Sequence, residues 1–232
     1  MTTHKHKYKY DIHTHTSEVS PCGKVDALEV VELYKQIGYK GIVVTDHYCK
    51  GFFDNIISPY WEEKIDRYLD GYKKAFNEGL RLGLNVILGI EITFNDGPED
   101  FLIYGIDEEF LKENPELYYL GLKEFRRLVQ DKGMLTYQAH PFRPKLAIQE
   151  PRLLDGIEVY NGNPRHDSKN DIAYSFAIES NLKMVSGSDF HQVQDLARGG
   201  IIIEENISTS KELAEVLGDN DDIELIMDEI KL

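Results

Sequence analysis

The sequence predicts one α/β domain built around a closed barrel of parallel strands. Short apolar runs of about five residues, the length of a buried strand, alternate with amphipathic, helix-like stretches along the 232-residue chain. Histidine or acidic side chains stand at the ends of at least five of these runs. A closed ring brings the C-terminal ends of all its strands to one mouth, whereas an open sheet keeps its first and last strands apart. This distribution therefore favours the closed barrel.

The period of the apolar residues sets the expected elements. In the segment 26–38, Asp26 is a suitable N-cap, apolar residues recur on overlapping faces, and Gly38 ends the helix. Strands are expected at 8–13, 41–46, 85–93, 101–105, 133–139, 156–160, 182–187 and 200–204. Further helices are expected at 60–83, 109–131, 168–180 and 208–217.

Proline and glycine residues are spread along the chain, where they mark the expected loops. They form no linker, and the chain has no low-complexity segment or repeat. We therefore expect residues 1–232 to form a single domain, with residues 1–7 as a frayed N-terminus. No G-x-G-x-x-G or Walker loop follows a strand, which excludes the usual nucleotide-cofactor folds.

The charge balance restricts the partners. The chain has 26 basic and 41 acidic residues and a formal net charge of −15, which opposes binding to long nucleic acids or anionic membranes. Part of this charge lies in the stretch 219–228, which we interpret as a solvated amphipathic end. Only two cysteines occur, and no apolar run approaches the ~20 residues of a membrane span. These features are typical of a reduced, cytoplasmic protein.

The segment DIHTHT (11–16) holds the first ligand-type pair. His13 and His15 alternate within a predicted strand, so both side chains point to the same face and can reach one metal ion. An isolated H-x-H motif in a strand more often lies on the surface or in the core without binding a metal. Here, however, further strands that end in histidine or acidic residues follow it. We therefore expect a metal role for both histidines.

Three more strand ends carry such residues. His47 ends GIVVTDH, where Asp46 is interpreted as an acceptor of an imidazole N–H or a contact to substrate. The ordinary alternative is a helix N-cap after the strand. Glu91 ends NVILGIE; an acid directly after a buried strand is costly unless it is paired or metal-bound, and its two oxygens can bridge two cations. His140 in YQAHP follows another strand, and Pro141 fixes the chain direction after it.

The segment SGSDFH (186–191) closes the set. Asp189 and His191 are again spaced by two, and the small residues before them leave room for a close neighbour. Imidazole and carboxylate ligands without a cysteine tetrad suit two or three divalent ions of Zn, Mn or Fe in a catalytic site. Such a centre is suited to hydrolysis through a metal-activated hydroxide.

These motifs, in this order, resemble the PHP (polymerase and histidinol phosphatase) family. The resemblance implies a distorted (βα)7 barrel, similar to a TIM barrel, with a di- or trinuclear metal site at its C-terminal mouth and phosphoester hydrolysis as its activity. It also implies three metal positions. The first would be held by His13, His15, Glu91 and Asp189, the second by Glu91 and His140, and the third by His47 and His191.

The sequence departs from the family pattern at two places. The loop after the first motif reads SEVSPCG, without the usual histidine or aspartate, and there Glu18 is slightly preferred over Cys22 as a ligand. Alternatively, Glu18 faces solvent and Cys22 packs as a small apolar side chain, and neither is a ligand. EDFLIYG lacks a histidine near the fourth strand, so Asp100 is the nearest ligand there, or simply begins the strand.

Phosphate recognition requires cationic donors beside the metal site. Arg143, Arg165 and Arg198 each follow a predicted strand on the ligand side, and we interpret them as substrate-binding residues, although a loop arginine can equally pair with a carboxylate. We expect Arg143, Asp189 and His191 to act in catalysis. The favoured substrate is a small phosphomonoester.

Two other functions fit parts of the same pattern. Amidohydrolase-like enzymes that cleave C–N bonds also use H-x-H in a barrel, but they commonly rely on a bridging lysine, and here Glu91 stands at the strand end. A non-catalytic accessory or regulatory metal-binding module is supported only by the two departures from the family pattern. The sequence does not specify the oligomeric state.

Overall fold

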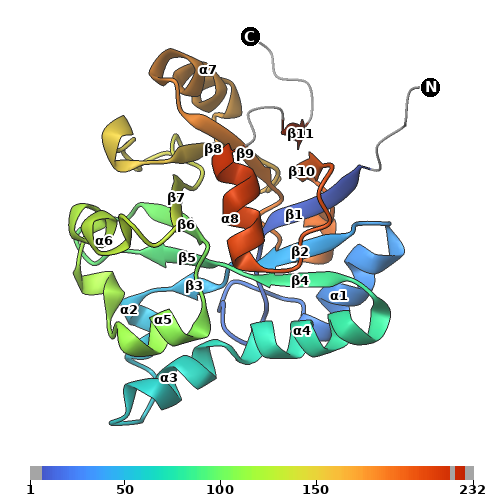
Figure 1. Cartoon of the computed structure of the whole chain (residues 1–232), viewed down its shortest axis with the longest axis vertical. Coiled ribbons are helices and arrows are strands. Elements are labelled where there is room, and N and C mark those ends of the chain that lie inside the picture. Colours follow the sequence, from blue (N-terminus) through green and yellow to red (C-terminus); the bar gives the residue numbers. More distant parts are fainter. Residues whose placement is uncertain (1–6, 220–222, 228–232) are drawn as a thin grey trace.

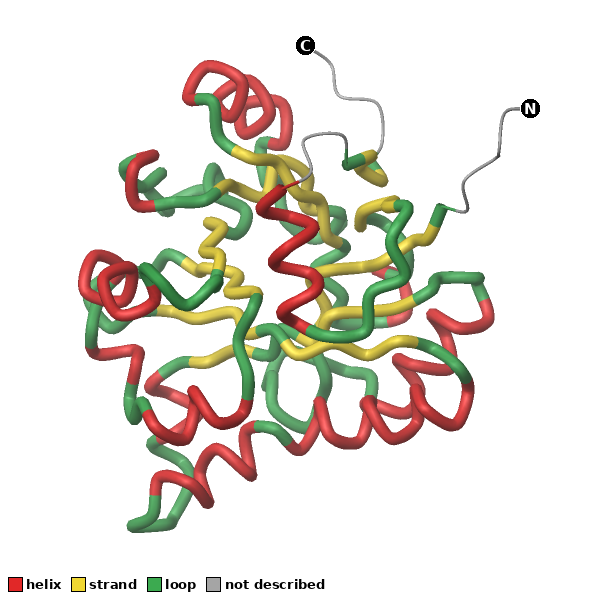
Figure 2. Tube along the Cα trace, in the orientation of Figure 1, coloured by secondary structure: helices red, strands yellow, loops and turns green. Residues whose placement is uncertain are grey.

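The computed structural model describes residues 7–219 and 223–227, which form a mixed α/β fold with two sheets. Figure 1 shows the strands in the middle of the molecule and most of the helices around them, and the same arrangement is seen in the yellow and red segments of Figure 2. The expected alternation of strands and helices is therefore present. Most expected elements lie within a few residues of the predicted ranges.

The first sheet contains the N-terminal strand and has the order β11-β10-β1-β2-β4. Its strands are β1 (Tyr8–Thr14), β2 (Gly41–Val44), β4 (Asn85–Leu88), β10 (Gly200–Ile203) and β11 (Glu224–Ile226). The β1–β2 and β2–β4 pairs are parallel, as predicted, but β10 runs antiparallel to both β1 and β11. Strand β11 lies in the acidic stretch 219–228, whose residues 220–222 and 228 lie outside the described residues.

The second sheet has the order β3-β5-β6-β7-β8-β9. Its strands are β3 (His47–Tyr48), β5 (Ile90–Thr93), β6 (Asp100–Tyr104), β7 (Leu135–Gln138), β8 (Gly156–Asn161) and β9 (Lys183–Gly187). Here the expectation of parallel strands is wrong for β6, which is antiparallel to both β5 and β7. The connection 94–99 is a turn without a helix, and a short connection of this kind joins antiparallel strands.

One predicted strand is divided between the sheets. The predicted strand 85–93 forms β4 and β5 with Gly89 between them, whereas the predicted strand 41–46 forms only β2, and β3 follows it at residues 47–48. A Cβ atom at Gly89 would lie 2.8 Å from Val43 Cγ1 and 3.0 Å from Thr45 Cγ2, so the close approach of the neighbouring strand requires glycine there. The two sheets also meet through an isolated parallel bridge between Thr14 and Phe190.

The helices surround the strands in Figure 1, except α8 (Ser210–Asp219), which crosses the middle of the view. The others are α1 (Ala27–Gln36), α2 (Lys50–Phe53), α3 (Trp61–Tyr68), α4 (Asp70–Leu82), α5 (Glu108–Glu113), α6 (Leu122–Val129) and α7 (Asn170–Ser180). Asp26 caps α1 by accepting the N–H groups of Leu28 and Glu29, and Gly38 follows with a φ of 81°, as the sequence predicts. The helices expected at 60–83 and 109–131 are each divided into two.

One buried apolar cluster draws on strands of both sheets. It includes Ile12 of β1, Leu102 of β6 and Val185 of β9, and Leu213 and Leu217 of α8 pack against them. Helix α8 therefore contributes to the same core as the strands. None of the helices among the described residues is long and apolar enough to cross a membrane.

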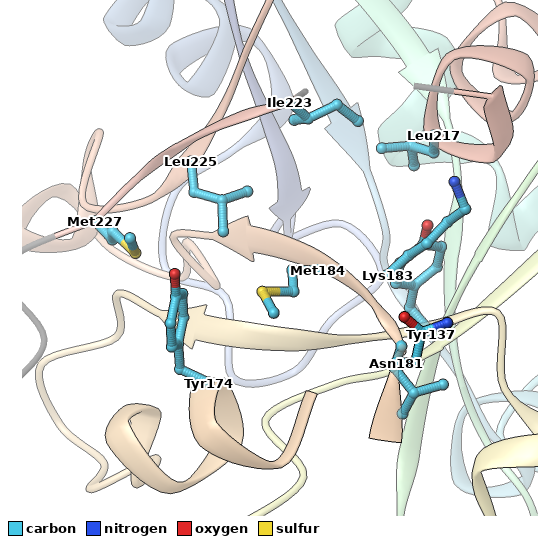
Figure 3. Close-up of a pocket in the computed structure, with 10 residues that line it drawn as sticks. Tyr137, Tyr174, Asn181, Lys183, Met184, Leu217, Ile223, Leu225 and Met227 are labelled. Carbon is cyan, nitrogen blue, oxygen red and sulfur yellow. The ribbon is translucent and has the colours of Figure 1, made fainter. Parts of the chain in front are cut away.

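A pocket of about 500 Å³ lies beside the first residues of β9. Figure 3 shows Lys183 and Met184 of β9 together with Tyr174 of α7, Leu217 of α8 and Leu225 of β11 around it. This is the opposite end of β9 from the one that leads into the SGSDFH motif. The histidines and acids singled out in the sequence do not line this pocket.

Candidate metal centre

The expected ligands converge from the ends of β1, β7 and β9 and from β3 and β5, the short strands that follow β2 and β4. His13 is in β1 and His15 follows it, His47 is in β3, and Glu91 is in β5. His140 follows β7, and Asp189 and His191 follow β9. Together with Asp100, these seven side chains fall into three groups whose potential ligand atoms lie within 4.8 Å of one another: His13, His15 and Asp189; Glu91, Asp100 and His140; and His15, His47 and His191.

The first group is fully buried. The Nε2 atoms of His13 and His15 lie 3.5 and 3.4 Å from Asp189 Oδ1. The same two nitrogens lie 3.3 Å from Glu91 Oε1 and 3.5 Å from Glu91 Oε2, respectively. Two imidazoles and two carboxylates therefore surround one point. His13, His15 and Glu91 have no exposed surface.

The second group lies on the other side of Glu91. His140 Nε2 is 3.1 Å from Glu91 Oε1 and 3.9 Å from Asp100 Oδ2. The other Asp100 oxygen accepts the Thr93 hydroxyl at 2.5 Å, which leaves Oδ2 directed at the group. Asp100 is the first residue of β6, and its side chain also reaches the cluster. Its interpretation as a strand start and its interpretation as a nearby ligand are therefore compatible.

The third group lies toward the surface. His47 Nδ1 is 2.7 Å from Glu91 Oε2, so Glu91 contacts all three groups. The rings of His15 and His191 stack with centroids 4.2 Å apart. The His191 Nδ1–H donates to the Asp189 carbonyl oxygen at 2.8 Å, which leaves Nε2 as its ligand nitrogen.

Several atoms in the cluster are buried without a hydrogen-bond partner. Among the described residues these atoms include His13 Nε2 and His15 Nε2. A buried polar atom without a partner costs free energy, and such atoms are rare unless a ligand satisfies them. The unsatisfied imidazole nitrogens face the carboxylates of Glu91 and Asp189. The donor set therefore fits divalent metal ions.

Charges inside the cluster keep its acids ionised. Burial disfavours charged His13, but Glu158, Glu91 and Asp189 outweigh it and raise the pKa of His13 well above its ordinary value. Burial also disfavours the ionised acids, but His13 and His47 outweigh it at Glu91, and His13 is the main opposing charge at Asp189. The pKa values of both acids are therefore well below their ordinary range, so both remain carboxylates.

Glu158 fixes the first group, and the sequence interpretation missed it. Its Oε1 accepts the His13 Nδ1–H at 2.8 Å, which directs Nε2 to the cluster. Its Oε2 accepts the backbone N–H of His140 at 3.0 Å and Asn161 Nδ2 at 2.9 Å. A buried acid inside the apolar run GIEVY was the available signal, because the burial cost that singled out Glu91 applies equally here.

Asp46 supports the cluster through the loop after β1. Ser20 Oγ lies 3.2 Å from His15 Nδ1 and donates to Asp46 Oδ1 at 2.7 Å. Thr16 donates both its backbone N–H and its hydroxyl to the same carboxylate, each at 2.7 Å. Asp46 is therefore linked to His15, one of the expected ligands, through Ser20, and among the described residues it does not accept an imidazole N–H directly.

The backbone is strained beside two of the ligands. His140 has a φ of 29° and Asp189 a φ of 52°, values that residues other than glycine rarely adopt. A Cβ atom at Gly187 would collide with His13 Cβ and lie 2.8 Å from Glu158 Oε1. The small residues of SGSDFH thus make room for the His13 side chain.

The three arginines are held in different ways. Arg143 Nη2 donates to Asp189 Oδ2 at 2.5 Å and to Asn161 Oδ1 at 2.8 Å. Arg165 pairs with buried Asp195, which accepts the backbone N–H of His191. Arg198 Nε donates to the Gly162 carbonyl at 3.0 Å. Only Arg143 contacts a side chain of the three groups directly.

The loop after the first motif places Glu18 and Cys22 differently. The Glu18 carboxylate accepts the Ala27 backbone N–H at 3.1 Å at the start of α1 and lies 3.5 Å from Lys74. Cys22 Sγ lies 3.1 Å from His47 Nε2. Burial raises the pKa of the Cys22 thiol, but hydrogen bonds with His191 and His47 outweigh burial and lower it to about 6.

A mixed α/β fold with grouped imidazoles and carboxylates is suited to a metal-binding protein, and comparison with known proteins identifies the family. The sequence profile of the PHP domain matches residues 11–198, and the chain therefore belongs to the PHP domain family. This confirms the resemblance seen in the sequence. None of the curated proteins compared with the chain matches it.

Solved structures share the fold at low sequence identity. A two-domain protein from Bacteroides vulgatus, described as containing a predicted PHP-like metal-dependent phosphoesterase, is 20% identical with a TM-score of 0.66. The match covers 96% of this chain and 65% of that one. PsfC from Pseudomonas syringae is 16% identical over 96% of this chain and 92% of its own, with a TM-score of 0.65.

A third structure carries a different description. An amidohydrolase from Chromobacterium violaceum with bound sulfate is 16% identical over 90% of this chain and 96% of its own, with a TM-score of 0.54. At these identities the three structures support the fold alone.

Proposed function

We propose that this protein is a metal-dependent phosphoesterase that hydrolyses a small phosphomonoester. The observation that carries the proposal is the position of Glu91, whose two oxygens face all three ligand groups, with the Arg143 guanidinium held at the edge of the cluster. A shared carboxylate suits neighbouring cations, and the arginine suits a phosphoryl oxygen. Membership of the PHP family supports the same activity.

The proposed ligands of two or three divalent ions, for which Zn, Mn and Fe are candidates, follow the three groups. His13, His15, Glu91 and Asp189 would hold the first ion, and Glu91, Asp100 and His140 the second. His47 and His191 would contribute to the third. Bound divalent ions supply Lewis-acid charge and activate water for attack on phosphorus. Glu18 is not retained as a ligand, because its carboxylate is engaged by the start of α1.

Arg143 is the residue proposed to bind the phosphate. Its Nε and Nη2 donate hydrogen bonds to Ser168, Asn161 and Asp189, and within the described ranges Nη1 donates none. The guanidinium is therefore fixed in the plane that leaves Nη1 for a phosphoryl oxygen. Asp189 divides its oxygens between the metal group and Arg143, so it couples the phosphate position to the first ion.

Arg165 and Arg198 are proposed as supporting residues of the substrate side. Arg165 fixes Asp195, which holds the backbone N–H groups of His191 and Gln192. Arg198 is fixed to the neighbouring Gly162 loop. The main contribution of the two arginines would be to hold the loops around the phosphate position. His191, the outer member of the cluster, remains a proposed catalytic residue.

We also infer that the two sheets close into one distorted barrel. The Thr14–Phe190 bridge and the shared apolar cluster support this closure, because both join β1 to the segment at or after β9. Closure would bring the first and last ligand-bearing strands together, as the site requires. The net charge of −15 supports a small substrate over a long nucleic acid.

The alternative of C–N bond hydrolysis is disfavoured by the residue at the shared position. Amidohydrolase-like sites commonly use a bridging lysine, and here a carboxylate faces all three groups. In the described part of the chain, the cations paired with Glu91 and Asp189 are histidines and Arg143.

Hydrolysis of p-nitrophenyl phosphate by metal-reconstituted protein tests the proposal. The protein loaded with Mn²⁺ or Zn²⁺ should release p-nitrophenol, and His13→Ala should abolish the release while the protein remains folded. Lys123→Ala, which alters an exposed side chain of α6 outside the three groups, is the control. Metal-loaded protein that is inactive on phosphomonoesters and other phosphoesters would favour the non-catalytic metal-binding module.

A further inference from the structure

The third ligand group is short of donors. His15 faces both the first and the third group, and its buried Nε2, which has no hydrogen-bond partner, can serve only one ion. If the first ion takes this nitrogen together with His13 and Asp189, only His47 and His191 remain for the third. Protein sites for Zn²⁺ usually supply three or four side chains. A further donor is therefore required.

Cys22 lies where such a donor is needed. Its Sγ is 3.1 Å from His47 Nε2, and the other ring nitrogen of His47 is 2.7 Å from Glu91 Oε2. The imidazole thus lies between a thiol and a carboxylate. A carboxylate on one ring nitrogen orients a histidine to bind metal through the other, which here is the nitrogen beside the thiol.

The loop that carries Cys22 is fixed against the histidines. The backbone N–H of Lys24 donates to the His191 carbonyl at 2.7 Å. Ser20, two residues before Cys22, contacts His15 Nδ1 at 3.2 Å. Residues 20–24 are therefore attached to two members of the third group. Cys22 reaches the cluster from this loop, whereas Glu18 is held at the start of α1.

We propose that the Cys22 thiolate is a ligand of the third metal ion, together with His47 and His191. This inference rests on the metal centre of the proposed function and specifies one of its sites. On binding, the S–H bond is broken, the proton passes to solvent and the sulfur lone pair forms the metal–sulfur bond. A thiolate ligand makes this position softer than the other two, so it selects Zn²⁺ over Mn²⁺.

Cobalt substitution tests the proposal without relying on activity. Metal-free protein is reconstituted with Co²⁺, whose thiolate complexes absorb in the near ultraviolet through charge transfer, whereas its nitrogen and oxygen complexes show only the weaker visible bands. Wild type and Cys49→Ser should show the charge-transfer band, and Cys22→Ser should lack it while keeping the visible bands. Cys49 is the matched control, because it is the other free cysteine and is also accessible.

The outcomes separate this proposal from the proposed function. A near-ultraviolet band that survives in Cys22→Ser, or visible bands without any charge-transfer band in wild type, would overturn Cys22 ligation alone. Absence of Co²⁺ binding in all variants would overturn the metal centre as well. In wild type, Zn²⁺ should also protect Cys22 but not Cys49 from iodoacetamide, a readout that does not depend on the folding of a variant. Equal alkylation of Cys22 with and without Zn²⁺ would contradict the proposal.

Discussion

Replacing Glu158 with glutamine should weaken metal binding without removing any proposed ligand. The Glu158 carboxylate accepts hydrogen bonds at both oxygens: His13 Nδ1–H at Oε1, and the His140 N–H and Asn161 Nδ2 at Oε2. Glutamine offers one acceptor oxygen and one N–H₂ group. The two donors at the Oε2 position favour the oxygen there, so the N–H₂ group is turned toward His13.

This exchange reverses the hydrogen bond that orients His13. Facing an amide donor, Nδ1 must accept, and the ring proton moves to Nε2. Nε2 lies 3.3 Å from Glu91 and 3.5 Å from Asp189, so the proton occupies the nitrogen needed by the metal. Loss of the partner that fixes a ligating histidine costs roughly 10–100-fold in metal affinity, or about 1.4–3 kcal/mol.

Competition with a chromophoric chelator for Zn²⁺ measures the change in affinity. Glu158→Gln should bind Zn²⁺ more weakly than wild type by this factor, and Glu205→Gln, which alters an exposed glutamate, should bind like wild type. Thermal melts of the metal-free proteins show whether each variant is folded. A folded Glu158→Gln variant with wild-type Zn²⁺ affinity would refute the role assigned to this hydrogen bond.

Three further predictions concern the substrate, a helix contact and a helix start. Arg143→Lys should lower kcat/KM for p-nitrophenyl phosphate roughly 10–100-fold, the loss of a charge-assisted hydrogen bond, with bound metal unchanged; unchanged kinetics would remove Arg143 from the phosphate site. Gly71→Ala should lower the unfolding free energy in urea by about 1–3 kcal/mol, because the added Cβ collides with Thr16 Oγ1. In Gly218→Ala the added Cβ meets open space, so this change should raise the unfolding free energy by roughly 0.5–1 kcal/mol. Equal effects of the two substitutions would contradict this reasoning. The Glu212 carboxylate accepts backbone N–H groups at the start of α8, and these hydrogen bonds lower its pKa below 4.5. The ionised carboxylate therefore stabilises the folded protein above that pH, and this stabilisation is lost below it. The difference in unfolding free energy between wild type and Glu212→Gln should therefore shrink as the pH falls below 4.5, and a constant difference would exclude this contribution.

The ligand groups could be anticipated from the sequence because their signal is local. An H-x-H pair in a strand and an acid directly after a buried run, as at Glu91, each carry a physical cost or geometry that points to a ligand. The structure brings these residues together at one set of strand ends. Glu158 obeys the same rule and was missed only because it lies within a strand rather than at its end.

Strand direction was less accessible to this reasoning. The alternation of strands and helices suggested that every strand is parallel, but the turn residues in NDGPED between β5 and β6 form a short connection that reverses the chain. Direction depends on which strands pair, and pairing is a property of the whole fold. The same limit applies to the choice between Glu18 and Cys22, since loop conformation alone decides which side chain reaches His47.

Anomalous diffraction from crystals of the Zn²⁺-loaded protein, recorded at the zinc absorption edge, tests the metal centre most directly. The account predicts a strong peak within about 2.0–2.2 Å of His13 Nε2, His15 Nε2 and an Asp189 oxygen, with a second zinc on the other side of Glu91. Crystals that show no anomalous peak among these side chains, at a zinc concentration that saturates the protein in solution, would contradict it.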